Sequence, residues 1–355
     1  MTMSGRPELT ICSVSFNSKS CLELSWALTA RLNPGAACSW IVVENSPETS
    51  SERLSLTDER FTMVEGAAVP NVPILGMRGS YHHAAGLRKA LARVEGSFLL
   101  VLDPDFFIVR ARWIEDVLSY MQANRLAFFG APYFPTRVTK YRYFPTVACL
   151  FIDLRRAPVS VLDVAPDAAE VERLRDANWR ALLAWSVRGV PPLGLPSRPS
   201  RRLALEVLGQ RCVAALTRRV PMLRQTGCSR DVGYRLYRFA RRCHLRSECL
   251  LPSWQNPLDR PAASARDRLK APCYRWLVPD SLCPYPKRRT STTAETFREA
   301  GLPDLNRWGW EEYFWQRAPF GFHLQGLFQG RQQASPSMIA EVLNRIGKAE
   351  DTVLV

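Results

Sequence analysis

The sequence lacks an apolar run long enough to cross a membrane. No uninterrupted apolar stretch reaches about 18 residues, which is roughly the length that a spanning helix needs. A secretory signal is also missing, because a strand-like run begins within ten residues of Met1 without a basic and apolar leader. These absences predict a cytoplasmic protein.

Closely spaced cysteine pairs are lacking too. The chain has 10 cysteines but no C-x-x-C pair, the spacing typical of zinc and redox sites, and several of them stand in apolar runs. We therefore expect reduced, mostly buried thiols and no zinc.

Acidic residues are in short supply. Lys and Arg number 48 against 33 Asp and Glu, so the net charge is +15 and favours anionic partners. The sequence has no zinc-finger spacing, RNA-recognition signature or basic-zipper heptads, and its arginines are spread along the chain. We expect no nucleic-acid partner, and a basic nucleic-acid-binding protein remains the alternative from another class of function.

What is present is an alternation of strand and helix signals over residues 1–155. It predicts an α/β fold with a mostly parallel sheet that is flanked by helices. The apolar, β-rich runs that suggest strands are Leu9–Phe16, Ser39–Glu44, Phe61–Glu65, Ser97–Leu102, Leu126–Ala131 and Thr146–Leu154. Helical spacing marks Ser20–Leu32, Tyr81–Val94 and Arg112–Ala123.

The alternation stops after residue 155, and the chain divides into three parts. Residues 156–226 are a basic helical insertion. Residues 227–355 are rich in Pro, Arg and aromatic side chains and predict a mixed helical and irregular region that ends in the helix Pro336–Gly347.

Polar side chains follow three of the predicted strands. Asn17 follows the first, Glu44 ends the second, and Asp103 and Asp105 come directly after the apolar run 97–102. Ligands of open α/β sheets bind beyond the carboxyl ends of the strands, and carboxylates are ligands for Mg²⁺ or Mn²⁺. Taken alone, the Asp pair could be a turn that caps the next helix. Its place beside two other polar strand ends favours instead a site for a metal that binds diphosphate.

These pieces resemble a known family. The run into Asn17, the strand that ends at Glu44, and the segment Gly96–Asp105 are similar to the nucleotide-binding half of a GT-A fold glycosyltransferase, most of all glycosyltransferase family 2. The resemblance implies inverting, metal-dependent transfer from a nucleotide-diphosphate sugar to a glycan, a lipid-linked sugar or another small acceptor. It places Asn17 and Glu44 at the nucleoside, Asp103 near the ribose and Asp105 on Mn²⁺ or Mg²⁺.

The resemblance also bears on residues 227–355, the acceptor-binding part. An inverting transfer needs a general base. We assign it to Asp231, at the start of an apparent helix, with Glu311 and Glu312 in a helix-like aromatic segment as alternates. Asp231 could instead cap the helix. Glu311 and Glu312 could instead be a charged pair exposed to solvent. His323 matches a C-terminal histidine that some GT-A enzymes use as an added metal ligand, although a core histidine is the competing interpretation.

The insertion carries a strongly basic segment. Arg198–Arg224 holds seven arginines and one glutamate, a net charge of 7 − 1 = +6, with an apolar stripe at helical spacing. This pattern predicts peripheral contact with anionic lipid at the cytoplasmic membrane face, or else an exposed helix.

Two further functions compete on the same topology. A sugar-phosphate nucleotidyltransferase needs a glycine-rich loop after the first strand, and the loop Asn17–Ser20 has no glycine. A degenerate GT-A domain that serves as a sugar-binding or scaffold protein would bind donor without hydrolysing it.

Overall fold

The structure is a computed structural model, and it describes well over half of the sequence. The described residues are 8–66, 78–134, 141, 144–166, 208, 231–253, 297–298, 300–303, 305, 310–324 and 335–353. The predicted lipid-binding segment Arg198–Arg224 therefore lies outside the described residues except for position 208. Among the described helices, none is long and apolar enough to cross a membrane.

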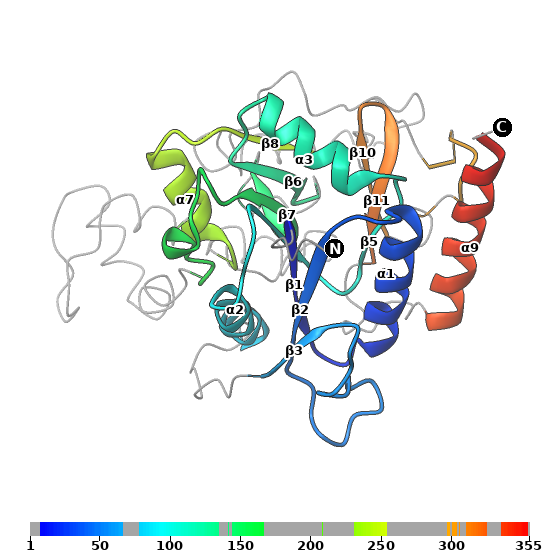
Figure 1. The fold of residues 1–355 in the computed structure, drawn as a ribbon, viewed down its shortest axis with the longest axis horizontal. Coiled ribbons are helices and arrows are strands. Elements are labelled where there is room, and N and C mark those ends of the chain that lie inside the picture. The colour runs from blue at the N-terminus through cyan, green and yellow to red at the C-terminus, as the bar shows by residue number, and fades with distance from the viewer. Residues whose placement is uncertain are drawn as a thin grey trace, which may run out of the picture.

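A mostly parallel central sheet forms the middle layer (Figure 1) and confirms the predicted α/β class. Its order is β3-β2-β1-β4-β7-β6-β8; the first four are mutually parallel, β7 runs antiparallel to both neighbours, and β8 is parallel to β6. The strands are β1 Leu9–Ser15, β2 Cys38–Glu44, β3 Thr62–Glu65, β4 Phe98–Leu102, β6 Phe128–Pro132, β7 Pro145–Asp153 and β8 Ser247–Cys249.

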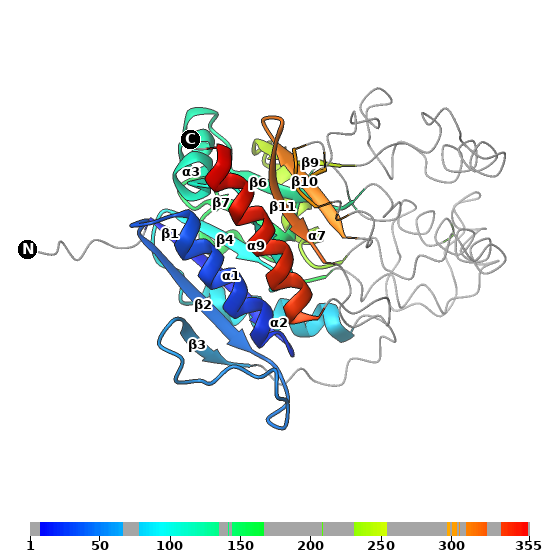
Figure 2. The same ribbon diagram turned by 90° about the vertical axis from the view of Figure 1, so that its right-hand side faces the viewer.

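Helices cover both faces of this sheet. Figures 1 and 2 show α1 and α9 side by side on one face, and α2 and α7 on the other. Their bounds, with those of α3 and the short 3₁₀ turn η1, are α1 Lys19–Leu32, α2 Arg78–Leu91, α3 Trp113–Ala123, η1 Val159–Val161, α7 Tyr234–Arg242 and α9 Pro336–Val353.

The double cover explains why β4 is apolar throughout. Leu100 and Leu102 belong to the core cluster built with α1, α3 and α9, whereas Leu99 and Val101 belong to the cluster built with α2 and α7. Successive side chains of a strand point to opposite faces, so a sheet buried on both sides needs apolar residues at every position.

A smaller antiparallel sheet stands beside the carboxyl ends of the central strands. Its order is β5-β11-β10-β9. The strands are β5 Phe106–Ile108, β9 Leu251–Pro252, β10 Glu311–Trp315 and β11 Ala318–His323. Because β5 directly follows the β4 region and β11 comes from the last third of the chain, this sheet joins parts of the sequence that lie far apart.

The prediction of a helix-like segment around Glu311 is wrong. Residues 311–315 form β10, which pairs with β11 through a two-residue turn at Gln316 and Arg317. Both turn residues have positive φ, 51° and 65°. Such turns favour Asn and Gly, so Gln-Arg gave no hairpin signal in the sequence.

Gly321 lets β11 approach β5 closely. A β-carbon at this position would lie 2.6 Å from the carbonyl oxygen of Phe107 and 2.9 Å from the ring of Phe106. We expect Gly321→Ala to force the strands apart and lower the free energy of unfolding by about 1–3 kcal/mol, as overpacking usually does.

Chemical denaturation measures this loss. The matched control is Gly79→Ala in the first turn of α2, where an added methyl group meets no atom within 4 Å of the described structure. Equal stabilities of the two variants would show that β5 and β11 can move apart to fit the methyl group without loss of stability.

Candidate functional site

The turn that carries Asp103 and Asp105 is held by both sheets. The N–H of Asp103 donates to the carbonyl of Ala148 in β7 at 2.9 Å, and its own carbonyl accepts the N–H of Phe106 at 3.0 Å. The carbonyl of Asp105 accepts the N–H of Leu324 at 3.0 Å, just beyond β11. The Asp pair therefore lies where the central sheet meets the small one.

His323 joins this turn from the far end of the sequence. It pairs in register with Phe106, and its Nε2 lies 3.1 Å from Oδ1 of Asp105. One potential ligand atom each from Asp103, Asp105 and His323 lies within 4.8 Å of the other two. The structure thus brings together Asp105 and His323, the two residues that the sequence analysis proposed as metal ligands, although 218 positions separate them.

The electrostatics of this group favour positive charge between the carboxylates. Burial raises the pKa of Asp103, and the charge of Asp105 adds to that rise. Burial also opposes ionisation of Asp105, but the charge and hydrogen bond of His323 outweigh it and lower the pKa of this carboxyl. Burial would lower the pKa of His323, yet Asp105 and Glu311 raise it well above its ordinary value.

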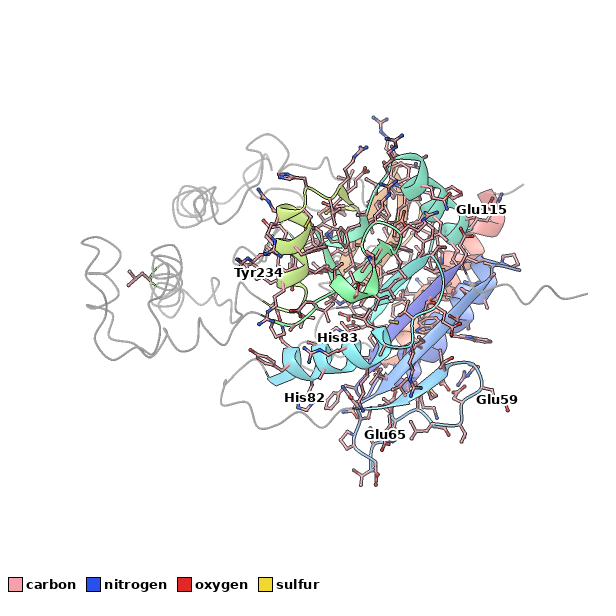
Figure 3. All side chains as sticks on the ribbon, turned by 60° about the vertical axis from the view of Figure 1, so that its left-hand side comes forward. Glu59, Glu65, His82, His83, Glu115 and Tyr234 are labelled. Atoms are coloured by element: carbon pink, nitrogen blue, oxygen red, sulfur yellow. The ribbon has the colours of Figure 1, made fainter. Side chains whose placement is uncertain are left out.

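The carboxylate of Asp103 also faces His83 of α2. The Nε2 atom of His83 lies 3.3 Å from Oδ1 of Asp103, which is buried and receives no hydrogen bond within the described structure. Figure 3 shows His82 and His83 leaving the helix in different directions. Since α2 begins at Arg78, His83 lies beyond the helix start and contacts the site through its side chain. A buried carboxylate oxygen that receives no hydrogen bond and lies beside further ligand atoms suits a cation.

Asn17 stands at the end of β1 in a left-handed conformation, with φ of 52°. Its N–H donates to Oγ of Ser46 at 2.7 Å, and its side-chain oxygen is buried without a hydrogen bond among the described residues. The amide oxygen is thus available to a ligand, and the donor-binding role of Asn17 stays a prediction.

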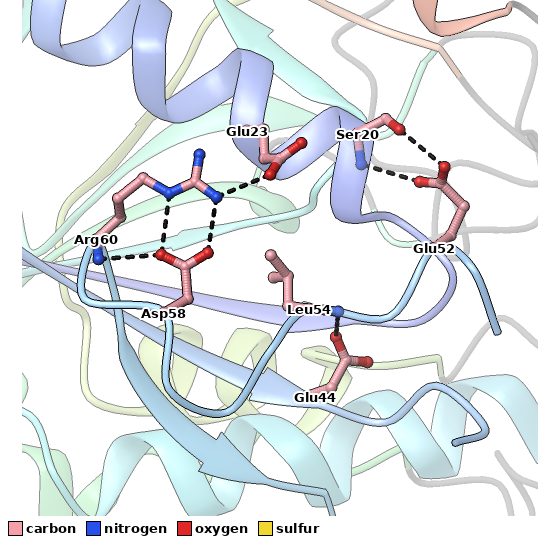
Figure 4. A network of polar contacts seen from close by, with 7 residues as sticks. All are labelled: Ser20, Glu23, Glu44, Glu52, Leu54, Asp58 and Arg60. Atoms are coloured by element: carbon pink, nitrogen blue, oxygen red, sulfur yellow. Dashed lines mark hydrogen bonds and ion pairs between the residues drawn. The ribbon is translucent and has the colours of Figure 1, made fainter. Parts of the chain in front are cut away.

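Glu44 holds the loop that follows β2 (Figure 4). Glu44 is only 1% exposed. Its two carboxylate oxygens accept the N–H groups of Ser46 and Leu54 at 2.7 and 2.8 Å. These bonds place the loop beside Asn17. A contact of Glu44 with the nucleoside stays a prediction.

Two other networks in Figure 4 tie the same loop to α1. Glu52 accepts the N–H and hydroxyl of Ser20 at 2.9 and 2.8 Å, and Arg60 bridges Asp58 and Glu23 at 2.7 and 2.8 Å. The loop is thereby fixed at several points along its length.

Asp231 lies shortly before α7, which begins at Tyr234 after Gly233 with φ of 83°. Its Oδ1 accepts the N–H of Val232 at 2.8 Å, and the helix start has no side-chain cap. The helix-cap interpretation is therefore wrong. The charge of Asp231 contributes to the raised pKa of Asp103, after larger contributions from burial and from other charged groups, so the two carboxylates are close enough to interact.

Glu311 and Glu312 are buried, at 5% and 0% exposure, so the interpretation as a solvated pair is wrong. Successive residues of a strand face opposite ways. Glu311 faces His323, with Oε2 at 3.3 Å from Nδ1. Glu312 accepts the N–H groups of Leu305 and Phe297 at 2.9 and 3.3 Å. Neither contact was predicted, and their role as alternate bases stays untested.

The six cysteines within the described residues are free thiols, and three of them are buried. Cys12, Cys21 and Cys149 are buried, while Cys38 and Cys243 are exposed. Burial, with smaller contributions from Asp105 and Glu52, raises the pKa of Cys21 to about 12. This thiol is near the site but stays protonated, which makes it a poor nucleophile and metal ligand.

A separate cavity of about 370 Å³ lies away from these residues. It opens at the start of β2 and β3, where Cys38 and Thr62 line it together with Arg60. In parallel sheets ligands bind at the carboxyl ends of the strands. We therefore place the candidate site at Asp103 and Asp105.

The sequence matches no protein-family model and no curated protein. Several solved structures are distantly similar. Mannosyltransferase PcManGT from Pyrobaculum calidifontis, solved with GDP-Man and Mn²⁺, is 11% identical with a TM-score of 0.32 over 78% of this chain and 86% of its own. Glucosyl-3-phosphoglycerate synthase from Mycobacterium tuberculosis, solved with Mn²⁺, UDP and glucosyl-3-phosphoglycerate, is 14% identical with a TM-score of 0.30 over 61% and 81%.

Galactosyltransferase LgtC, solved with donor and acceptor sugar analogs, is 12% identical with a TM-score of 0.28 over 78% of this chain and 98% of its own. Similarities this low assign neither a family nor an activity. The functional argument therefore rests on the residues of the site.

Proposed function

We propose that the protein is a divalent-metal-dependent glycosyltransferase that moves a sugar from a nucleotide diphosphate to an acceptor hydroxyl. One observation carries the proposal: Asp103, Asp105 and His323 converge within 4.8 Å beside the carboxyl ends of a parallel sheet. This edge is where α/β proteins of this kind bind nucleotides.

The side chains of the group fit Mn²⁺ or Mg²⁺. Carboxylate oxygens suit both ions, and the imidazole of His323 shifts the preference toward Mn²⁺. In the proposal Asp105 and His323 hold the ion, and Asp103 contacts the ribose of the donor. A bound ion would neutralise charge on the diphosphate leaving group.

The remaining residues divide between the two substrates. Asn17 and Glu44 contact the nucleoside, and Asp231 accepts the proton of the acceptor hydroxyl. In an inverting step the acceptor oxygen forms a bond to the anomeric carbon as the bond from that carbon to the diphosphate breaks. The acceptor is a glycan, a lipid-linked sugar or another small molecule.

Thermal unfolding with a panel of nucleoside diphosphates tests this proposal. We expect one of them to raise the melting temperature only when Mn²⁺ is present, because a ligand at 100 times its Kd adds about 2.7 kcal/mol of stability. Donor hydrolysis should then occur with the sugar nucleotide that carries the same base.

Two outcomes would contradict the proposal. Metal-dependent binding without any donor hydrolysis would indicate a sugar-binding or scaffold protein. No response to any nucleotide, together with a salt-sensitive affinity for random DNA, would indicate a nucleic-acid-binding protein.

A further inference from the structure

The imidazole of His323 lies between two carboxylates that come from different strands and turns. Nε2 faces Oδ1 of Asp105 at 3.1 Å, and Nδ1 faces Oε2 of Glu311 at 3.3 Å. Glu311 and His323 are directly opposite each other in the β10–β11 ladder. The hairpin register therefore sets which ring nitrogen faces which carboxylate.

Glu311 is itself held in place. Its side chain is 6% exposed, and the hydroxyl of Tyr313 lies 3.1 Å from the same Oε2. That hydroxyl also lies 3.2 Å from the carbonyl of Pro132 in β6. The rings of Tyr313 and His323 both pack against Phe106, with centroids 5.6 and 5.9 Å away. Packing and hydrogen bonds thus leave Glu311 little freedom to turn away from His323.

This arrangement matters for metal binding because a neutral imidazole binds through the nitrogen without a proton. A carboxylate that accepts the N–H of the other nitrogen selects the tautomer, fixes the ring plane and strengthens the ligand. With Glu311 at Nδ1, the lone pair of Nε2 points toward Asp105.

We propose that Glu311 is a positioning residue that presents Nε2 of His323 to the metal. This inference rests on the proposed function, since it assumes that His323 is a ligand. It also separates Glu311 from the role of general base, because its carboxylate is buried against His323 and Tyr313 while a base must reach the acceptor hydroxyl.

Mn²⁺ affinity, measured by electron paramagnetic resonance of the free ion, tests the inference without turnover. Glu311→Ala should weaken Mn²⁺ binding about 10–100-fold, the usual cost of losing such a partner. Glu311→Gln keeps an oxygen that can accept the Nδ1 proton, so its loss of Mn²⁺ affinity should be smaller. This variant keeps the inference testable if Glu311→Ala does not fold.

Glu312→Gln is the matched control. It changes the neighbouring buried carboxylate, which bonds to the backbone at Phe297 and Leu305 and faces away from His323. We expect lower thermal stability, because the substitution weakens these backbone hydrogen bonds, with Mn²⁺ affinity within about twofold of the wild type. Equal weakening by the Glu311 and Glu312 variants would show a general effect of strand packing and overturn the inference.

Nitrogen NMR of the Zn²⁺-loaded protein gives a second readout. His323 should show a proton on Nδ1 and metal on Nε2 in the wild type, with a mixture of tautomers in Glu311→Ala. Wild-type protein that binds no Mn²⁺ would overturn the proposed metal site along with this inference. Normal Mn²⁺ binding by both wild type and Glu311→Ala would overturn only the positioning role.

Discussion

Replacing Asp105 with asparagine should abolish turnover and metal-dependent nucleotide binding while the fold persists. The substitution removes one carboxylate from the proposed metal-binding group that Asp105 forms with Asp103 and His323. Loss of a residue that hydrogen-bonds to a metal ligand weakens metal affinity about 10–100-fold, and loss of a ligand itself should weaken it further. Turnover over a range of Mn²⁺ concentrations, together with nucleotide-induced thermal shifts, measures both effects.

The fold should persist because the backbone bond from Leu324 to the carbonyl of Asp105 does not involve the side chain. The matched control is Glu115→Gln on α3, labelled in Figure 3, where the side chain is 68% exposed. Such a surface change usually alters stability by less than about 0.5 kcal/mol. Asp105→Asn with normal Mn²⁺-dependent turnover would remove Asp105 from the site.

The central sheet could be predicted because its signal is local. The run Ser97–Leu102 is apolar at every position and ends at Asp103, and the structure has β4 at Phe98–Leu102. The same holds for Ser39–Glu44 against β2 at Cys38–Glu44. A strand buried on both faces carries its pattern in its own residues.

The small sheet could not be predicted because its strands depend on distant partners. β5 spans only Phe106–Ile108, and it pairs with β11 from the last third of the chain. β10 begins with two glutamates, which indicate an exposed face unless their buried partners are known. Short strands have little propensity of their own, so tertiary pairing decides them.

In the candidate site, too, only the residues with a local sequence pattern could be predicted from the sequence. Asp103 and Asp105 were visible because they follow one apolar run directly. His323 entered only through the family resemblance. The contacts of His83 and Glu311 could not be predicted, because they depend on how α2 packs and on the register of the β10–β11 hairpin. Contacts between distant elements leave no local pattern in a single sequence.

Asp231→Asn should lower turnover by about 10²–10⁴-fold, the usual contribution of a general base, with little change in donor affinity. The structure makes this substitution a clean test. Gly233, not Asp231, precedes the first residue of α7, and an asparagine oxygen can still accept the N–H of Val232. The variant therefore keeps the local backbone bond while it removes the basicity of the carboxylate.

Asp163→Asn supplies the matched control for this experiment. Asp163 forms an ion pair with Arg235 of α7 at 2.9 Å, and its side chain is 49% exposed. It supports the helix that follows Asp231 but has no described contact with Asp103 or Asp105, so turnover should stay within about twofold of the wild type. Single-turnover rates at saturating donor and Mn²⁺ isolate the chemical step in both variants. If Asp231→Asn and Asp163→Asn were equally active, Asp231 would not be the base, and another group would accept the proton of the acceptor.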